Sequence, residues 1–184
     1  MSTTFPRIGV LIGSTRQGSL NQALAQHAAA LSPVDLTVVE GIYALPHFSQ
    51  ELEADAPQSV ADLRGAVAGL DALLLVTPEY NASMPGVVKN AIDWLSRPYD
   101  ASVLAGLPVA VIGASPGRGG ASGAVGDAVR VLQRAGAAPL EATVTVPRAH
   151  AVLGQQLEDE LKDRLGALLD ELISAAEARA TNAA

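Results

Sequence analysis

Apolar segments of two kinds alternate along the chain. Short runs made mostly of apolar residues predict strands that are covered on both faces, and they occupy Arg7–Ile12, Leu36–Val39, Ala72–Val76 and Pro108–Ile112. A further segment, Leu140–Val146, alternates between apolar and polar residues and predicts a strand at the edge of a sheet. The pattern therefore predicts five strands.

Between these segments, apolar residues recur every three or four positions, as on one face of a helix. The predicted helices cover Leu20–Leu31, residues 60–70, a segment that begins with Pro85 and stops before Pro98, Ala124–Ala135, and a closing stretch from Leu157 to Ile173. Residues 178–184 are expected to fray. Alternating strands and helices predict an α/β fold with a parallel sheet covered on both sides. Five strands favour the flavodoxin-like, doubly wound order 2-1-3-4-5, and we expect a single domain over residues 1–184.

Composition excludes several functions. The net charge is −7, whereas nucleic-acid binding requires an excess of Lys and Arg; the same charge disfavours an anionic membrane surface. The absence of cysteine excludes disulfides, thiol catalysis and thiolate metal sites. We recognise neither a signal peptide nor an apolar run of about 20 residues, so we expect a soluble, cytoplasmic protein. The three histidines have no metal-ligand spacing, so we predict neither a metal site nor a Ser-His-Asp triad.

The segment between the first strand and the first helix carries groups that bind phosphate. A phosphate at a helix N-terminus meets unpaired N–H groups and the positive end of the helix dipole, and side-chain hydroxyl and guanidinium groups add donors. The candidate donors are Ser14, Arg16, Ser19 and Asn21. Asn21 either braces the loop or reaches the phosphate. A turn with a capping serine explains the same residues about equally well.

Spacing excludes two common nucleotide-binding loops here. A P-loop requires a lysine after its second glycine, but Gly18 is followed by Ser19. The dinucleotide fingerprint requires a glycine where this chain has Thr15. Without those glycines, Glu40 at the end of the second strand is weak evidence for a ribose contact.

The segments after the third and fourth predicted strands suit a flat ring. Pro78, Glu79, Tyr80 and Asn81 would approach such a ring edge-on, although a packing tyrosine and a turn-forming asparagine are the plain alternatives. After the fourth strand, glycines allow backbone N–H groups to converge on an electron-rich edge; the candidates are Ser115, Gly117, Arg118, Gly119 and Gly120. Arg118 would add to this contact with the ring or bind a phosphate of an incoming nicotinamide cofactor, or else lie in solvent.

With these residues, the chain resembles the NADPH-dependent FMN reductase family of flavodoxin-like proteins. The matching residues are Gly13–Arg16 with Ser19 and Asn21, then Pro78–Asn81, Ser83, Pro85, Gly86, Lys89, Asn90 and Asp93, then Ser115, Gly117, Gly119 and Gly120, and Arg130 with Gly136 and Ala137. The resemblance implies FMN, with its phosphate on Ser14, Arg16, Ser19 and Asn21 and its ring between Pro78–Asn81 and Ser115–Gly120. It also implies a homodimer or homotetramer, with Phe48 as a candidate contact of the second subunit. Ala82 departs from the glycine that is common in the family.

The resulting hypothesis is an FMN-dependent oxidoreductase in which NADPH or NADH gives a hydride to the flavin. A small-molecule acceptor, such as a quinone, free flavin, an azo dye or a metal oxyanion, then takes the electrons. The flavin carries the chemistry, so no catalytic side chain is expected. Two alternatives are a flavodoxin-type electron carrier reduced by a protein partner, and a domain of this fold that no longer binds flavin.

Overall fold

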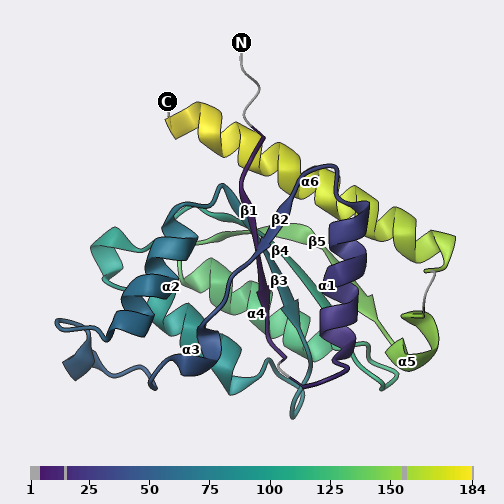
Figure 1. The fold of residues 1–184 in the computed structure, drawn as a ribbon, viewed down its shortest axis with the longest axis horizontal. Helices are drawn as coiled ribbons and strands as arrows, with labels where there is room; N and C mark the ends of the chain where they lie inside the picture. The colour runs from purple at the N-terminus through teal and green to yellow at the C-terminus, as the bar shows by residue number, and fades with distance from the viewer. Residues whose placement is uncertain (1–4, 15, 155–156, 184) are drawn as a thin grey trace.

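The computed structural model describes residues 5–14, 16–154 and 157–183 (Figure 1). Its centre is a parallel sheet with the strand order β2-β1-β3-β4-β5, so the predicted order is confirmed. The strands are β1 (Ile8–Ile12), β2 (Leu36–Val38), β3 (Ala72–Thr77), β4 (Pro108–Ala114) and β5 (Ala138–Val146). Every residue of β3 and β4 is buried, which explains why these segments show no polar alternation.

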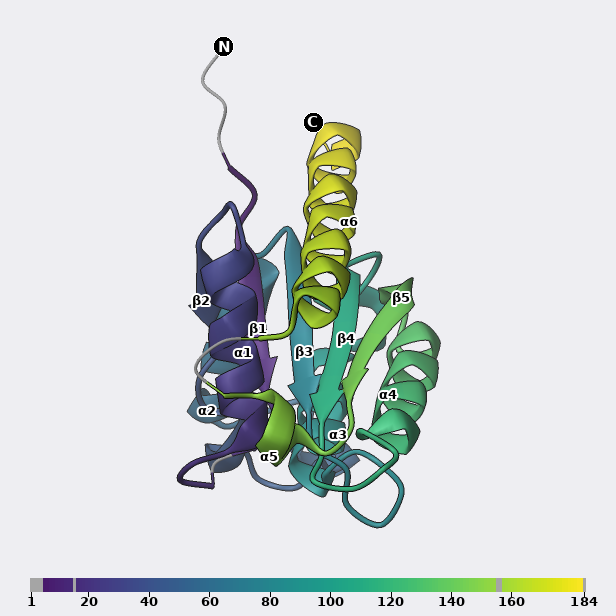
Figure 2. The same ribbon diagram turned by 90° about the vertical axis from the view of Figure 1, so that its right-hand side faces the viewer.

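Helices cover both faces of the sheet (Figures 1 and 2). Helices α1 (Leu20–Leu31) and α6 (Asp159–Ala183) pack on one face, where Leu24 and Leu165 belong to the same buried cluster. Helices α2 (Gln58–Ala68), α3 (Gly86–Leu95) and α4 (Ser122–Arg134) pack on the other, in a cluster that includes Leu63, Val88 and Val125. The sheet therefore separates two apolar layers.

Short elements complete the chain. Among the described residues, 3-10 turns cover Ile42–Ala44, Gln50–Leu52 and Tyr99–Ala101, and the four-residue helix α5 (Ala149–Val152) follows β5. No helix within the described residues is long and apolar enough to cross a membrane.

Three sequence-based expectations about helix ends were wrong. Pro85 caps α3 instead of beginning it, and the helix starts at Gly86. Leu157 is buried but precedes α6, which begins at Asp159. The predicted frayed end is helical as far as Ala183, because α6 is anchored there: Arg179 Nη1 donates to the carbonyl of Leu70 at 3.0 Å.

The sheet order places the site. The chain leaves β1 toward the α1 face and leaves β3 toward the α3 face, so the connections after these neighbouring strands diverge. In open parallel sheets, ligands bind in the crevice at this switch point, outside the carboxyl ends of the strands. Figure 2 shows β3 and β4 pointing to the end of the molecule where α5 also lies.

Candidate FMN site

A hollow of about 300 Å³ lies at the switch point, outside the ends of β1, β3 and β4. The structure brings eight of the predicted site residues together around it, namely Ser14, Arg16, Ser19, Asn21, Pro78, Glu79, Tyr80 and Ser115. Asn81, Gly117, Arg118, Gly119 and Gly120 are not among its lining residues. A larger hollow, of about 610 Å³, lies near Arg7 and Pro33 at the amino end of the sheet, where none of the predicted site residues is found.

The first wall is the loop after β1. Ser19 caps α1, because its Oγ accepts a hydrogen bond from Gln22 N at 3.3 Å, and the hydroxyl hydrogen is still available to a ligand. Arg16 is exposed, and its Nη2 donates to the carbonyl of Gly18 at 3.3 Å. Gly18 has φ 66°, a left-handed conformation that lets the chain turn into α1. Thr15 lies outside the described residues. The loop thus gathers hydroxyl, guanidinium and helix N–H donors at one end of the hollow.

Asn21 braces this loop against the sheet. Its Nδ2 donates to the carbonyl of Ala114 and its Oδ1 accepts from Ala114 N, both at 2.9 Å. The side chain is 3% exposed, and Ala114 is the last residue of β4. Of the two roles that the sequence left open, the structure supports the brace, because the amide already satisfies both backbone groups of Ala114.

The second wall is a tight hairpin after β3. Tyr80 and Ser83 exchange backbone hydrogen bonds, at 2.9 Å and 3.1 Å, around a two-residue turn. The turn residues Asn81 and Ala82 have φ 52° and 61°, as in a type I′ turn. Asn81 therefore sits in the turn-forming position, while Tyr80 stays 55% exposed beside the hollow.

The hairpin is docked on α4. The Oε2 atom of Glu79 accepts a hydrogen bond from Ala124 N at 3.1 Å, so a carboxylate caps a helix whose own N-cap residue, Ala121, has no capping side chain. The hydroxyl of Ser83 and, second, Arg130 hold the pKa of Asp127 on the same helix below its usual value. Sequence reasoning placed Glu79 against the ring, but its carboxylate fixes the loop that carries Tyr80.

The third wall is the glycine-rich loop after β4. Its backbone is tied to the start of α5: Arg148 N donates to the carbonyl of Gly117, and Ala149 N donates to that of Ser115, both at 3.0 Å. Gly120 has φ 61°, and a β-carbon there would lie 2.6 Å from the backbone nitrogen of Pro147. This glycine is required by packing against the segment after β5. Arg118 is exposed and has no hydrogen bond or ion pair with the residues that the structure describes.

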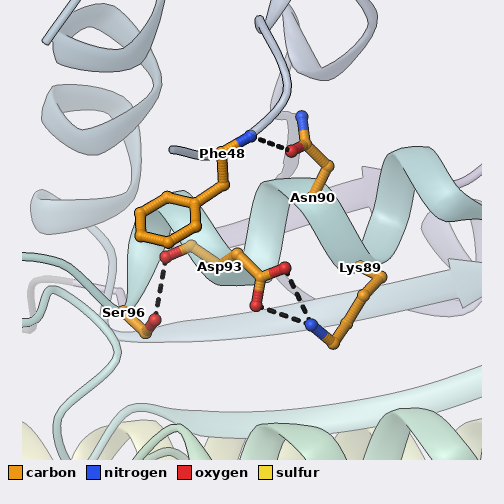
Figure 3. Close-up of polar contacts among 5 residues, drawn as sticks. All are labelled: Phe48, Lys89, Asn90, Asp93 and Ser96. Atoms are coloured by element: carbon orange, nitrogen blue, oxygen red, sulfur yellow. Dashed lines mark hydrogen bonds and ion pairs between the residues drawn. The ribbon is translucent and has the colours of Figure 1, made fainter. Parts of the chain in front are cut away.

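The polar motif on α3 supports a neighbouring segment (Figure 3). Asn90 accepts from Phe48 N at 2.8 Å and donates to the carbonyl of Pro46 at 3.0 Å, while Lys89 pairs with Asp93 at 2.7 Å. The Phe48 ring packs edge-on against Trp94, with ring centroids 5.0 Å apart. Asn90 and Trp94 therefore hold Phe48 beside α3, and a contact of Phe48 with a second subunit stays a prediction.

The family model of NADPH-dependent FMN reductases matches residues 6–151. The chain belongs to this family. Among curated relatives, 2-hydroxy-1,4-benzoquinone reductase of a Burkholderia species is 46% identical over 112 residues, which are 60% of this chain and 61% of that protein. A quinone reductase of Pseudomonas putida is 42% identical over 119 residues, 64% of each chain. The chain thus spans less than two thirds of the length of these relatives.

A solved structure extends the likeness over nearly the whole chain. FerB, a flavoenzyme NAD(P)H:acceptor oxidoreductase from Paracoccus denitrificans, superposes with a TM-score of 0.84 at 34% identity, covering 95% of this chain and 98% of that one. The two chains therefore share their overall fold.

The residues around the hollow fit the cofactor of the FMN reductase family. An anionic phosphate suits the hydroxyl, guanidinium and N–H donors of the loop after β1, and an exposed aromatic side chain, Tyr80, stands on a rigid hairpin nearby. Four lining residues were not predicted from the sequence, namely Leu20, Ala114, Pro116 and His150, and of these only His150, on α5, has an ionisable side chain. Only the tertiary hydrogen bonds of α5 bring it here, and nothing in the local sequence indicates them.

Proposed function

We propose that this protein is an FMN-dependent NAD(P)H oxidoreductase that reduces quinones or similar small acceptors. The observation that carries the proposal is the hollow at the switch point, where phosphate donors and a hairpin bearing an exposed tyrosine meet in a chain of the FMN reductase family. Bound FMN would supply hydride acceptance from NADPH or NADH and electron transfer to the acceptor.

The protein's own contribution is to bind and orient the flavin. Arg16, Ser14 and Ser19 would hold the phosphate, and the Tyr80 hairpin and Ser115 would border the ring. Because Glu79 and Ser83 fix the hairpin to α4, the ring wall is preorganised before the ligand binds. No side chain is required as a proton donor for the hydride transfer itself.

The proposed acceptor class is supported by the relatives, since both curated relatives described above are named for quinone reduction. We further propose that the protein acts as a homodimer or homotetramer, with Phe48 near the interface. We also propose a cytoplasmic location, as predicted from the sequence.

An anaerobic experiment tests the function. FMN-loaded protein is mixed with NADPH and, separately, with NADH, and the visible absorbance of oxidised flavin is followed. Rapid bleaching supports the oxidoreductase and identifies the preferred nucleotide; later addition of a benzoquinone should restore the absorbance. Flavin that binds but stays oxidised would favour an electron carrier reduced by a protein partner. A protein that does not bind FMN would refute both functions.

A further inference from the structure

Helix α5 is held against the site by the site's own loops. Its start is fixed by the hydrogen bonds from Arg148 N and Ala149 N to the loop after β4. Ala149 is fully buried in the cluster that contains Leu24 of α1, and the ring of His27 on α1 bonds to the carbonyl of Gly154 at 3.1 Å. Although α5 has only four residues, it is therefore fixed on both sides.

His150 lies on this helix and lines the hollow. It is exposed, and its imidazole makes no hydrogen bond or ion pair within the described ranges. Among the residues that line the hollow, Arg16 and His150 are those that can carry a positive charge. The one lining carboxylate, that of Glu79, accepts a hydrogen bond at the N-terminus of α4. A phosphate monoester carries about −1.5 to −2 charge at pH 7, more than one arginine balances.

The packing of α5 determines at which end of the hollow His150 lies. Helix α5 packs with α1, which is capped by Ser19 and carries Asn21 in its first turn, on the face of the sheet shared with α6. The hairpin with Tyr80 is docked on α4, on the opposite face. His150 thus enters the hollow from the side of the phosphate donors.

We propose that His150 binds the phosphate group of FMN together with Arg16, closing the phosphate end of the site from the α5 side. This inference rests on the proposed function, because it assumes that FMN occupies the hollow. His150 is a binding residue in this account and takes no part in hydride transfer.

Paired titrations of FMN and riboflavin test the inference. Riboflavin has the same ring and ribityl chain but no phosphate, so a phosphate contact affects only FMN. In titrations of the flavin-free protein followed by flavin fluorescence, His150→Ala should raise the Kd for FMN by about tenfold, as expected for a lost hydrogen bond to a charged group. The Kd for riboflavin should stay within about twofold of the wild type. His150→Gln, which keeps an N–H donor, should give an intermediate value for FMN.

Arg148→Ala is the matched control. Arg148 precedes α5, is exposed and does not line the hollow, and it contributes only its backbone N–H to the loop. This variant removes a full positive charge two residues away, so it should leave the Kd for FMN within about twofold.

The outcomes separate the inference from the function on which it rests. A wild-type protein that binds neither flavin would refute the proposed function and the inference with it. If the wild type binds FMN but His150→Ala binds it equally well, the inference alone is wrong. Equal weakening of FMN and riboflavin by His150→Ala, or equal weakening of FMN by Arg148→Ala, would also overturn it, since the effect would then be structural or a general effect of charge.

Discussion

Replacing Asn21 by alanine should destabilise the protein even in the absence of any ligand. The asparagine amide satisfies both backbone groups of Ala114 through two hydrogen bonds of 2.9 Å, and both residues are almost fully buried. Alanine would leave one buried N–H and one buried carbonyl without partners. Each unsatisfied group costs about 1–3 kcal/mol, or about 2–6 kcal/mol for the two. A water molecule in the vacated space would offset part of this, so we expect a loss of about 2–4 kcal/mol.

Urea unfolding of the flavin-free protein measures this loss. The midpoint should fall with little change in the slope of free energy against urea, because the surface exposed on unfolding is the same. For a chain of this size, the expected loss corresponds to a melting temperature lower by about 5–15 °C. Gln22→Ala is the control: this side chain is exposed on the same helix, and the substitution should change stability by no more than about 0.5 kcal/mol.

Asn21→Asp sharpens the test because aspartate has nearly the same shape. One carboxylate oxygen can still accept the hydrogen bond from Ala114 N. At neutral pH the other carboxylate oxygen faces the carbonyl oxygen of Ala114, and neither of these two oxygens can donate a hydrogen bond to the other. Burial and this repulsion should raise the pKa of the introduced acid in the folded state. The variant should therefore regain stability relative to the wild type as the pH falls and the acid is protonated.

The reasoning has a clear refutation. If flavin-free Asn21→Ala unfolds at the wild-type urea concentration while its affinity for FMN falls, Asn21 contacts the phosphate and does not brace the loop. A loss of stability in the flavin-free protein that matches the estimate would establish the brace.

Four further predictions follow from the site and its supports. Ala82→Gly should stabilise the protein by about 1 kcal/mol in urea unfolding, because φ 61° strains a residue with a β-carbon; an unchanged midpoint would contradict the strain. Gly113→Ala should cost about 2–3 kcal/mol in the same assay, because its β-carbon would lie 2.7 Å from a carbonyl oxygen of β3. Arg16→Ala should weaken FMN binding by about 1.5–3 kcal/mol, and unchanged titrations would remove Arg16 from the phosphate site. Because the pKa of Asp127 is lower in the folded state, its ionised carboxylate stabilises the fold at pH values above its unfolded-state pKa, and this stabilisation is lost as the pH falls through its folded-state pKa. The stability advantage of the wild type over Asp127→Asn in urea unfolding should therefore shrink below about pH 4.

The core strands could be predicted from the sequence because a strand that is buried on both faces is a continuous run of apolar residues. Leu73–Val76 and Val109–Ile112 are apolar without interruption, and the structure buries all of these residues. The strand order followed from the number of strands and the alternation with helices. Helix α5 could not be predicted in this way, because four residues are too few to show a helical repeat of apolar positions. The hydrogen bonds that hold α5 are made with residues more than 30 positions earlier.

The residues that line the hollow were easier to predict than the role that each side chain has there. Eight predicted residues line the hollow, yet a side chain near a ligand site can serve the loop instead of the ligand. Asn21 and Glu79 show this: each is an acceptor for a backbone N–H on a distant element, Ala114 and Ala124 respectively. Sequence spacing cannot reveal such partners, because they are fixed only when the helices pack on the sheet. The prediction that residues 178–184 fray failed for the same reason, since Arg179 donates to the carbonyl of Leu70.

The position of the hollow has a consequence for how the molecule would unfold. The two apolar layers lie on opposite faces of the sheet, and the walls of the hollow belong to both, through α1 and α5 on one side and the hairpin docked on α4 on the other. A ligand that contacts both walls would tie together regions that otherwise open independently. Flavin should therefore slow amide hydrogen exchange in α4 as well as in α1, so that the two halves of the protein open as one cooperative unit.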